Sequence, residues 1–363
     1  MAAPRLEIDL DKICHNARRL VERLAPRGIS VTGVTKASLG CPAIATAMLR
    51  AGVHSLGDAR IENIETMRSA RVAAPMTLIR SPLPSQVARI VRQADTSFNT
   101  ELDVIRQLSS AAQRAKRMHA VVLMVELGDL REGIMPGKLE SVVRETMRLP
   151  NIVFKGIGTN LACRCGVSPD ARNMAELSAL ANSVEAAFGT TLSIVSGGNS
   201  ANLDWVLGGA KTGRINNLRL GESILLGCEP LQRQPIAGLH TDAITLVAEV
   251  IESKLKPSQP WGEAGQSAFG LPSAVQNRGD ICQTILAIGH QDIDPEGLRA
   301  PAGVEILGAS SDHLVIESDR CLPAGSEISF QLNYSALMRA MTSPFVVKVK
   351  KSRGHQTCRY RHR

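Results

Sequence analysis

A lysine ends one of the most apolar segments near the N-terminus. The stretch SVTGVTK, residues 30–36, is typical of a strand that is buried on both faces, and Lys36 is its last residue. An ammonium group at such a place is costly unless it is paired or used. An apolar setting lowers the pKa of a lysine and leaves a free amine, which is a nucleophile. Lys36 is therefore a candidate catalytic amine, and the alternative is a structural lysine that is paired or extends to water.

Two turns rich in glycine and serine could bind a phosphate group. SGGNSAN spans residues 196–202 just before a helical segment, and LGES spans residues 220–223 after a strand-like run. Such turns let backbone N–H groups approach an anion closely. Taken alone, each is an ordinary turn. The candidate ligands are Ser196, Gly197, Asn199, Ser200, Gly221, Glu222 and Ser223.

Strand-like and helix-like segments alternate over the first part of the chain, and these elements must position the candidate residues. The expected strands are 30–36, 54–59, 76–80, 96–99, 120–127, 154–160, 192–198 and 217–223. The segments between them have apolar residues at helical spacing. Eight such units predict an α/β fold, a (β/α)8 barrel of the TIM type, with the active site at the carboxyl ends of its strands. A doubly wound nucleotide-binding fold competes, but no GxGxxG follows an early strand.

The pattern changes near residue 235. Segments such as AITLVAEVIESKLKP (243–257) alternate apolar and polar residues between turn-like clusters of proline and glycine. We therefore predict a barrel over residues 1–232, a C-terminal all-β domain over 233–347, and a disordered basic tail over 348–363.

Charge and composition exclude several classes of function. The formal net charge is +8, but seven lysines and arginines lie in residues 348–363, so the folded part is almost neutral. Aromatic residues make up only 3% of the chain, which leaves little surface for stacking on bases. We expect no nucleic-acid partner. No apolar run is long enough to span a membrane, and the eight cysteines lack zinc spacing, so we expect a cytoplasmic protein with reduced thiols and no metal.

Several separated motifs resemble the alanine racemase family of pyridoxal phosphate enzymes. The opening LEIDLDKICHNARRL and the strand end VTKA carry this resemblance. The ornithine racemase branch is the most similar, through ELGDLREGIM (126–135), IVSGGNSAN (194–202), NLRLGESILLG (217–227), AIGHQD (287–292) and ILGASSDHLVIES (306–318). The resemblance spans residues 5–345 and implies the barrel followed by a β domain.

The resemblance implies a role for each candidate residue. Lys36 would hold pyridoxal 5'-phosphate covalently, and the two turns at the seventh and eighth strands, with Tyr334, would hold its phosphate. Arg219 matches the arginine beside the pyridine nitrogen, and Arg131 matches the arginine beside the phenolic oxygen of the ring. Because a guanidinium keeps its proton, Arg219 leaves that nitrogen unprotonated and favours simple proton exchange at Cα.

The chain also departs from the family pattern. Met124 replaces a lysine that helps to hold the arginine matching Arg131, so Glu126 or Asp129 is expected to hold it instead. Asn160 replaces a histidine under the ring.

The second base is the most consequential departure. The family tyrosine that serves in this role is His290 here. An imidazole can act as a base near neutral pH. A structural loop histidine is the alternative, and Cys163 and Asp312 are rival bases.

The resemblance implies a racemase that interconverts L- and D-amino acids with two bases, Lys36 and His290. It implies a homodimer, because family members take the second base from a partner subunit. Ornithine or another basic amino acid is the expected substrate, with alanine or broad specificity as the alternative. A lyase or decarboxylase would need an acid where Arg219 stands, and a non-enzymatic cofactor carrier would lack the β domain.

Overall fold

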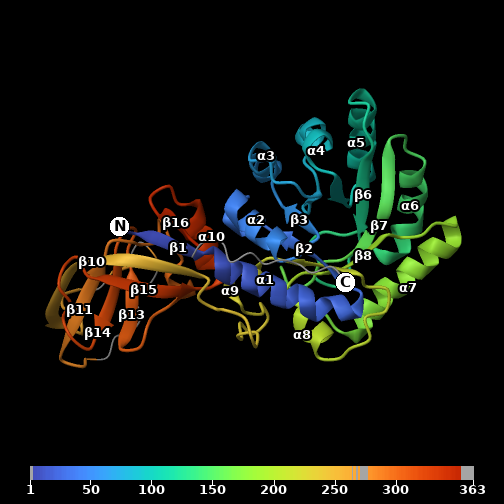
Figure 1. The fold of residues 1–363 in the computed structure, drawn as a ribbon. Helices are drawn as coiled ribbons and strands as arrows, with labels where there is room; N and C mark the ends of the chain where they lie inside the picture. The colour runs from blue at the N-terminus through green and yellow to red at the C-terminus, as the bar shows by residue number, and fades with distance from the viewer. Residues whose placement is uncertain (1–2, 264, 267–268, 270–276, 353–363) are drawn as a thin grey trace. The chain divides into compact units, whose positions relative to one another are not determined.

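The computed structural model describes residues 3–263, 265–266, 269 and 277–352, and it divides into two compact units. One unit runs from Leu10 to His240. The other joins the described residues up to Asp9 with those from Thr241 to Ser352. Figure 1 shows the strands and helices of both units along the chain.

The first unit is a closed parallel barrel of strands β2 to β9 (Figure 1). The strands are β2 (Ser30–Val34), β3 (Ser55–Asp58), β4 (Met76–Leu78), β5 (Thr96–Asn99), β6 (His119–Met124), β7 (Ile152–Gly158), β8 (Ile194–Gly198) and β9 (Asn217–Leu220). The last strand closes on the first, with Ser30 opposite Asn217 and Gly33 opposite Leu220. The predicted barrel of eight strands is confirmed.

Helices precede and follow the barrel strands. They are α1 (Leu10–Leu24), α2 (Pro42–Arg50), α3 (Ile61–Ser69), α4 (Val87–Gln93), α5 (Leu102–Arg114), α6 (Leu139–Met147), α7 (Ala171–Phe188), α8 (Asn202–Leu207) and α9 (Glu222–Leu226). Local sequence sets their ends: Asp170 and Asn173 form a capping box at the start of α7, and Gly189 ends it with a positive φ of 57°.

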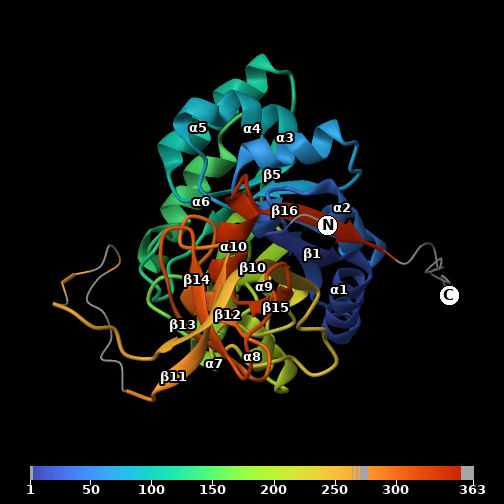
Figure 2. The ribbon, with the colours of Figure 1, turned by 90° about the vertical axis from the view of Figure 1, so that its left-hand side faces the viewer.

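The second unit is an antiparallel sheet with the order β12-β15-β10-β11-β14-β13 (Figure 2). The strands are β10 (Ile244–Pro257), β11 (Asp280–Leu286), β12 (Leu298–Arg299), β13 (Val304–Ala309), β14 (Leu314–Ser318) and β15 (Glu327–Leu332). β10 pairs with β15 over Thr245–Glu249 and with β11 from Val250 onward, and the β10–β11 ladder has a register shift between Val250 and Glu252. The predicted β domain after the barrel is confirmed; it was expected to be all-β, but its described part also carries the α-helix α10 (Tyr334–Thr342).

The unit boundaries differ from those predicted over 1–232, 233–347 and 348–363. β1 (Arg5–Asp9) belongs to the sheet, because it pairs with β10 and with β16 (Val347–Lys351). The Arg5 guanidinium also forms a bidentate ion pair with Glu327 at 2.5 and 2.7 Å. The start of the basic tail is therefore a strand, and the rest of it lies outside the described residues.

One disulfide differs from the expectation of reduced thiols. It joins Cys282 in β11 to Cys321, whose Cα atoms lie 5.2 Å apart. The sequence does not indicate this pair, because the two residues are 39 positions apart and meet only when β14 pairs with β11 and the chain continues past β14 to Cys321.

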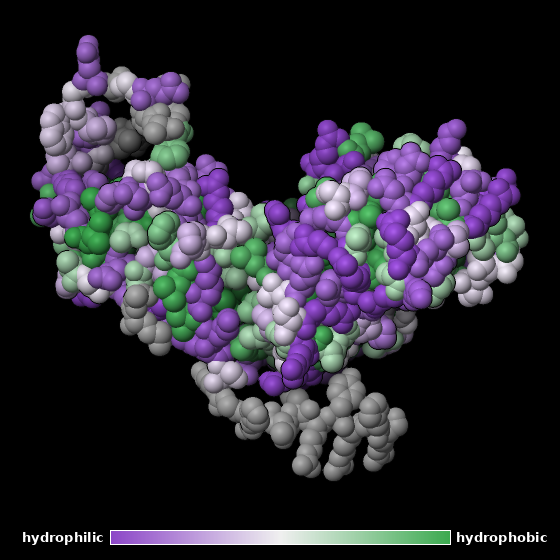
Figure 3. Space-filling model, turned by 90° about the horizontal axis from the view of Figure 1, so that it is seen from above, coloured by the Kyte–Doolittle hydropathy of each residue, from purple (hydrophilic) through white to green (hydrophobic). Residues whose placement is uncertain are grey.

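Figure 3 shows mostly hydrophilic side chains on the visible surface of each unit, with hydrophobic ones scattered among them. No helix in the described part of the chain has the length and hydropathy needed to cross a membrane.

Candidate active site

Lys36 lies two residues beyond the end of β2, in a short 3-10 turn over Lys36–Ser38. The pairing of β2 with β3 continues up to this turn, because the Thr35 N–H donates to the Gly57 carbonyl at 2.9 Å. Leu39 and Gly40 then reverse the chain with positive φ angles of 53° and 65°. The lysine is thus presented at the carboxyl ends of the barrel strands, where the sequence predicted the site.

The surroundings of Lys36 bring together residues from four other segments of the barrel unit. Its electrostatic neighbours are Asp58, Arg131, Cys163 and Arg219. Burial is the main cause that lowers the pKa of Lys36, and the two guanidinium groups lower it further, against Cys163 and Asp58. A lowered pKa increases the fraction of neutral amine near neutral pH, so Lys36 can act as a nucleophile and as a base.

Arg219 in β9 is the most deeply buried of these cations, with 4% of its surface exposed. It donates to Ser196 Oγ at 2.7 Å, to the Thr159 carbonyl at 2.9 Å and to Asn160 Oδ1 at 3.0 Å. Its guanidinium carbon lies 5.1 Å from the centroid of the Phe98 ring. Burial lowers the pKa of Arg219 to about 10, so the group remains charged at neutral pH.

All three hydrogen-bond acceptors of Arg219 are neutral oxygens. Among the ion pairs of the described residues, none includes Arg219, and its Nε–H donates to no described residue. A buried cation held in this way is expected to face a ligand atom with a lone pair.

Asn160 and Asn199 connect the ends of β7 and β8. The Asn199 amide donates to Asn160 Oδ1 at 3.2 Å, to the Leu161 carbonyl at 2.8 Å and to Cys163 Sγ at 3.4 Å. The Asn160 Nδ2 atom is buried and has no hydrogen-bond partner within the described part of the chain. A buried amide without a partner is costly and is expected to meet a ligand.

The two predicted phosphate turns lie side by side. Ser200 Oγ and Ser223 Oγ are 3.0 Å apart, and the Ser223 N–H donates to Ser200 Oγ at 3.3 Å. Gly221 can lie close to β2 because it has no Cβ atom. A Cβ at this position would lie only 3.1 Å from Val34 Cβ. The Glu222 carboxylate accepts from Arg233 at 3.1 Å.

Ser196 differs from the phosphate role that the sequence suggested. Its hydroxyl donates to Asn217 Oδ1 at 2.7 Å and accepts from Arg219, inside the barrel. Its part in the site is to hold Arg219, and Ser200 and Ser223 remain the hydroxyl candidates for a phosphate.

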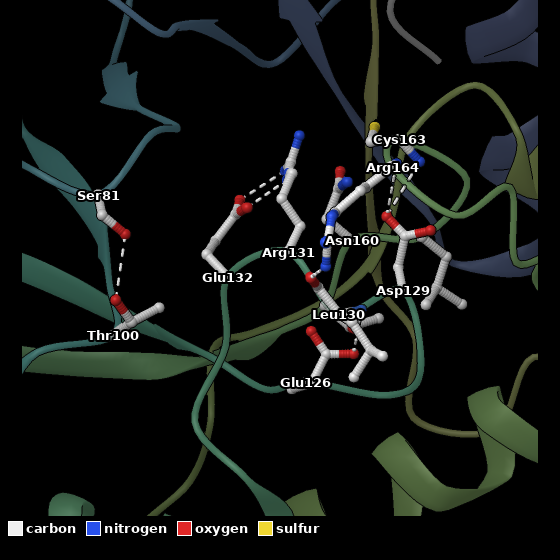
Figure 4. Close-up of polar contacts among 12 residues, drawn as sticks. Ser81, Thr100, Glu126, Asp129, Leu130, Arg131, Glu132, Asn160, Cys163 and Arg164 are labelled. Atoms are coloured by element: carbon white, nitrogen blue, oxygen red, sulfur yellow. Dashed lines mark hydrogen bonds and ion pairs between the residues drawn. The ribbon is translucent and has the colours of Figure 1, made fainter.

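The loop after β6 corrects the expectation about Arg131. Figure 4 shows the carboxylate of Glu132 against the Arg131 guanidinium, with one contact at 2.5 Å. Glu126 instead accepts from the N–H groups of Gly128 and Leu130 at 2.6 and 3.0 Å.

Asp129 also binds backbone groups and not Arg131. It accepts from the N–H groups of residues 163, 164 and 165 at 3.1, 2.9 and 3.1 Å (Figure 4). Neither Glu126 nor Asp129 holds the Arg131 side chain, because both stabilise the backbone of these loops. Met124, which replaces the family lysine, packs in the barrel core against Phe98 and Val122.

His290, Asp312 and Tyr334 all belong to the sheet unit. The His290 ring stacks on Phe269 with centroids 4.1 Å apart, and its carbonyl accepts from Arg339 at 3.0 Å. Asp312 is exposed, and its contact with His313 at 2.8 Å lowers the pKa of its carboxyl. Tyr334 is the first residue of α10.

Sequence reasoning did not select Asp58 or Glu132. Asp58 ends β3, so its place at a strand end was the available signal. Glu132 directly follows the candidate Arg131, and only the loop conformation turns it back onto that residue.

The donor set fits pyridoxal phosphate. A neutral amine can bind the aldehyde, a buried guanidinium and an amide offer unused N–H groups, and two adjacent turns offer hydroxyls for a phosphate. Among the residues searched in the described ranges, no cluster of three His, Cys, Asp or Glu side chains could hold a metal ion.

Known proteins share both the sequence and the fold. The chain is 38% identical over 352 residues to the lysine racemase of Thermotoga maritima, covering 96% of this chain and 99% of that protein. It is 36% identical over 350 residues to the ornithine racemase of Acetoanaerobium sticklandii, covering 95% and 99%.

Solved structures show the same fold at lower identity. The alanine racemase of Streptomyces lavendulae has a TM-score of 0.75 at 19% identity and covers 97% of this chain and 98% of its own. The D-threonine aldolase of Filomicrobium marinum has a TM-score of 0.72 at 16% identity, with 96% and 92% covered. Residues 8–230 match the family described as "Alanine racemase, N-terminal domain". With this match and two relatives aligned over almost their whole length, the chain belongs to the alanine racemase family.

Proposed function

We propose that the chain is a pyridoxal-phosphate-dependent racemase of a basic amino acid, with ornithine or lysine as substrate. The observation that carries this proposal is the half-buried Lys36 amine beside the buried Arg219 guanidinium at the mouth of a barrel of this family. The two near-full-length relatives are a lysine and an ornithine racemase, which favours a basic substrate over alanine.

Several residues would hold the cofactor. Lys36 would bind it covalently, Ser200, Ser223 and the N–H groups near Gly221 would bind its phosphate, and Arg219 would face its ring nitrogen. Asn160, Asn199, Arg131 and Tyr334 complete the proposed set. When bound, pyridoxal phosphate withdraws electrons from the amino acid and acidifies its Cα–H bond.

Lys36 would move the proton on one face of Cα. Burial and two nearby guanidinium groups lower the pKa of its amine, so Nζ can take a proton near neutral pH and return it. The half-buried position limits the access of water to this amine.

Arg219 selects simple proton exchange over deeper carbanion chemistry. Its guanidinium stays charged and cannot give a proton to the ring nitrogen. A lyase or decarboxylase would need an acid at this position. The D-threonine aldolase shares the fold, which by itself carries no activity to this chain.

The second base is proposed from position in the family pattern. His290 stands where the family has its tyrosine, and we place it opposite Lys36 at a site shared between two subunits of a homodimer. Asp312 is the rival in the sheet unit. Cys163 is the rival in the barrel unit, and its electrostatic contact with Lys36 supports it. A cytoplasmic location stays a prediction.

The test is a chiral chromatographic assay of the purified protein with cofactor against single L-amino acids. We expect D-ornithine or D-lysine to form at least ~10-fold faster than D-alanine, and Lys36→Ala to abolish both reactions. A preference for alanine would overturn the substrate class, and cleavage of a substrate without racemisation would overturn the reaction class.

A further inference from the structure

Asp58, at the end of β3, is a fully buried carboxylate with no cationic hydrogen-bond partner. Asp58 Oδ2 accepts from Thr35 Oγ1 at 2.7 Å, and Oδ1 accepts from Asn63 Nδ2 and from the Arg60 N–H at 2.9 Å each. None of the ion pairs within the described ranges includes Asp58. Burial raises the pKa of its carboxyl, and these three donors lower it. Burying a carboxylate costs free energy of folding, so we expect Asp58 to have a role beyond packing.

The bonds of Asp58 hold the chain on both sides of Lys36. Thr35 directly precedes the lysine, and its side chain and backbone are both fixed on β3. On the other side, Gly40 packs on Asn63, since a Cβ at Gly40 would lie 2.5 Å from the Asn63 carbonyl oxygen. The Gly40 N–H also donates to the Thr35 carbonyl at 3.2 Å, which closes the turn. Thr35, Asp58 and Asn63 therefore form a buried clamp around the lysine.

Asp58 also supplies charge. The groups that face Lys36 are Asp58 from β3, Arg131 from the loop after β6, Cys163 from the loop after β7, Arg219 from β9 and Glu222 from α9. Burial and, after it, the two arginines lower the pKa of Lys36, and Cys163 and Asp58 oppose them. The charge of Asp58 therefore favours the protonated amine and moves the pH at which Lys36 becomes neutral upward, as the smallest of these influences.

We propose that Asp58 is a positioning residue for Lys36, which through Thr35 and Asn63 fixes the turn that presents the amine to the cofactor. The inference rests on the proposed function, since it requires that Lys36 binds pyridoxal phosphate. It adds a specific residue that acts on the lysine without touching the substrate.

The first test uses Asp58→Asn, which keeps the shape and removes the charge. In the full-length protein freed of cofactor, labelling of Lys36 by a small acylating reagent is followed against pH by mass spectrometry. The midpoint should move to lower pH, because the nearby opposite charge that raises the pKa of Lys36 is lost. Glu229→Gln is the matched control. Glu229 is another buried carboxylate of the same unit and accepts only from backbone N–H groups, so the Lys36 profile should stay unchanged.

The second test separates position from charge. Thr35→Val keeps the charge of Asp58 and removes its 2.7 Å bond to the turn. Capture of added pyridoxal phosphate, trapped by borohydride on the Lys36 peptide, should slow by ~10-fold or more, and Thr35→Ser should restore it.

The outcomes of the two tests are separable from failure of the proposed function. An unshifted labelling profile in folded Asp58→Asn, or normal capture in Thr35→Val, overturns the role of Asp58. If the unmodified protein carries no cofactor on Lys36, the proposed function fails first, whatever the variants do.

Discussion

Replacement of Arg219 by Gln should both destabilise the barrel and change its chemistry. The guanidinium makes three hydrogen bonds to buried or partly buried acceptors, and the two N–H groups of a glutamine amide can replace two of them at most. Bonds from a charged donor contribute ~1.5–3 kcal/mol each, so the loss of at least one should lower the free energy of unfolding by roughly 1.5–3 kcal/mol or more. Removal of the buried charge offsets part of this loss.

The same substitution removes the fixed charge that faces the proposed ring position. Racemisation should fall ~10²-fold, as when one preorganised donor is removed from an active site. Transamination should appear as a side reaction. Urea denaturation measures the first effect, and chiral chromatography with detection of pyridoxamine phosphate measures the second.

Arg214→Gln is the matched control. Arg214 pairs with Glu185 at 2.7 Å in a partly exposed site of the same unit, so its loss should cost less than about 1 kcal/mol and leave racemisation unchanged. Equal stability of Arg219→Gln and Arg214→Gln, with normal racemisation in both, would refute the reasoning about the buried guanidinium.

Three further predictions address the second base, the disulfide and the lysine. His290→Ala should slow racemisation by ~10²–10⁴-fold, and mixing it with Lys36→Ala should restore activity through mixed dimers; failure despite verified subunit exchange would remove the shared site and favour Cys163. The disulfide closes a loop of 39 positions, so replacing Cys282 and Cys321 by serine should lower the free energy of unfolding by about 4 kcal/mol in denaturation assays. Cys165 forms no disulfide, so Cys165→Ser should change this free energy little. The pKa of Lys36 in the folded protein is lowered from 10.5, so cofactor-free Lys36→Met should be more stable than the parent at pH 7. This gain in the free energy of unfolding should vanish as the pH rises through 10.5. A gain that does not depend on pH would contradict the burial of an ionisable amine.

The fold was predictable because its signals are periodic and local. The eight barrel strands are short apolar runs separated by helical segments, and the later strands alternate between turn residues. Strand pairing between distant segments was not predictable in this way. β1 lies in the sheet and not in the barrel, and the disulfide joins β11 to the loop after β14, because both depend on contacts across the chain.

The candidate site likewise has features that the sequence predicts and features that it does not. Lys36 and the two turns stand at strand ends, where barrel geometry alone points to them. The partner of Arg131, the inward hydroxyl of Ser196 and the clamp at Asp58 depend on rotamers and loop paths. A sequence pattern does not specify these features, which is why Glu126 and Asp129 were expected where Glu132 lies.

The most direct test of the central claim is the chemical identity of the lysine that carries the cofactor. The purified protein, reduced with borohydride in the presence of pyridoxal phosphate and digested, should yield one modified peptide, with the cofactor on Lys36. Modification of another lysine, or none while the protein racemises amino acids, would contradict the assignment of Lys36.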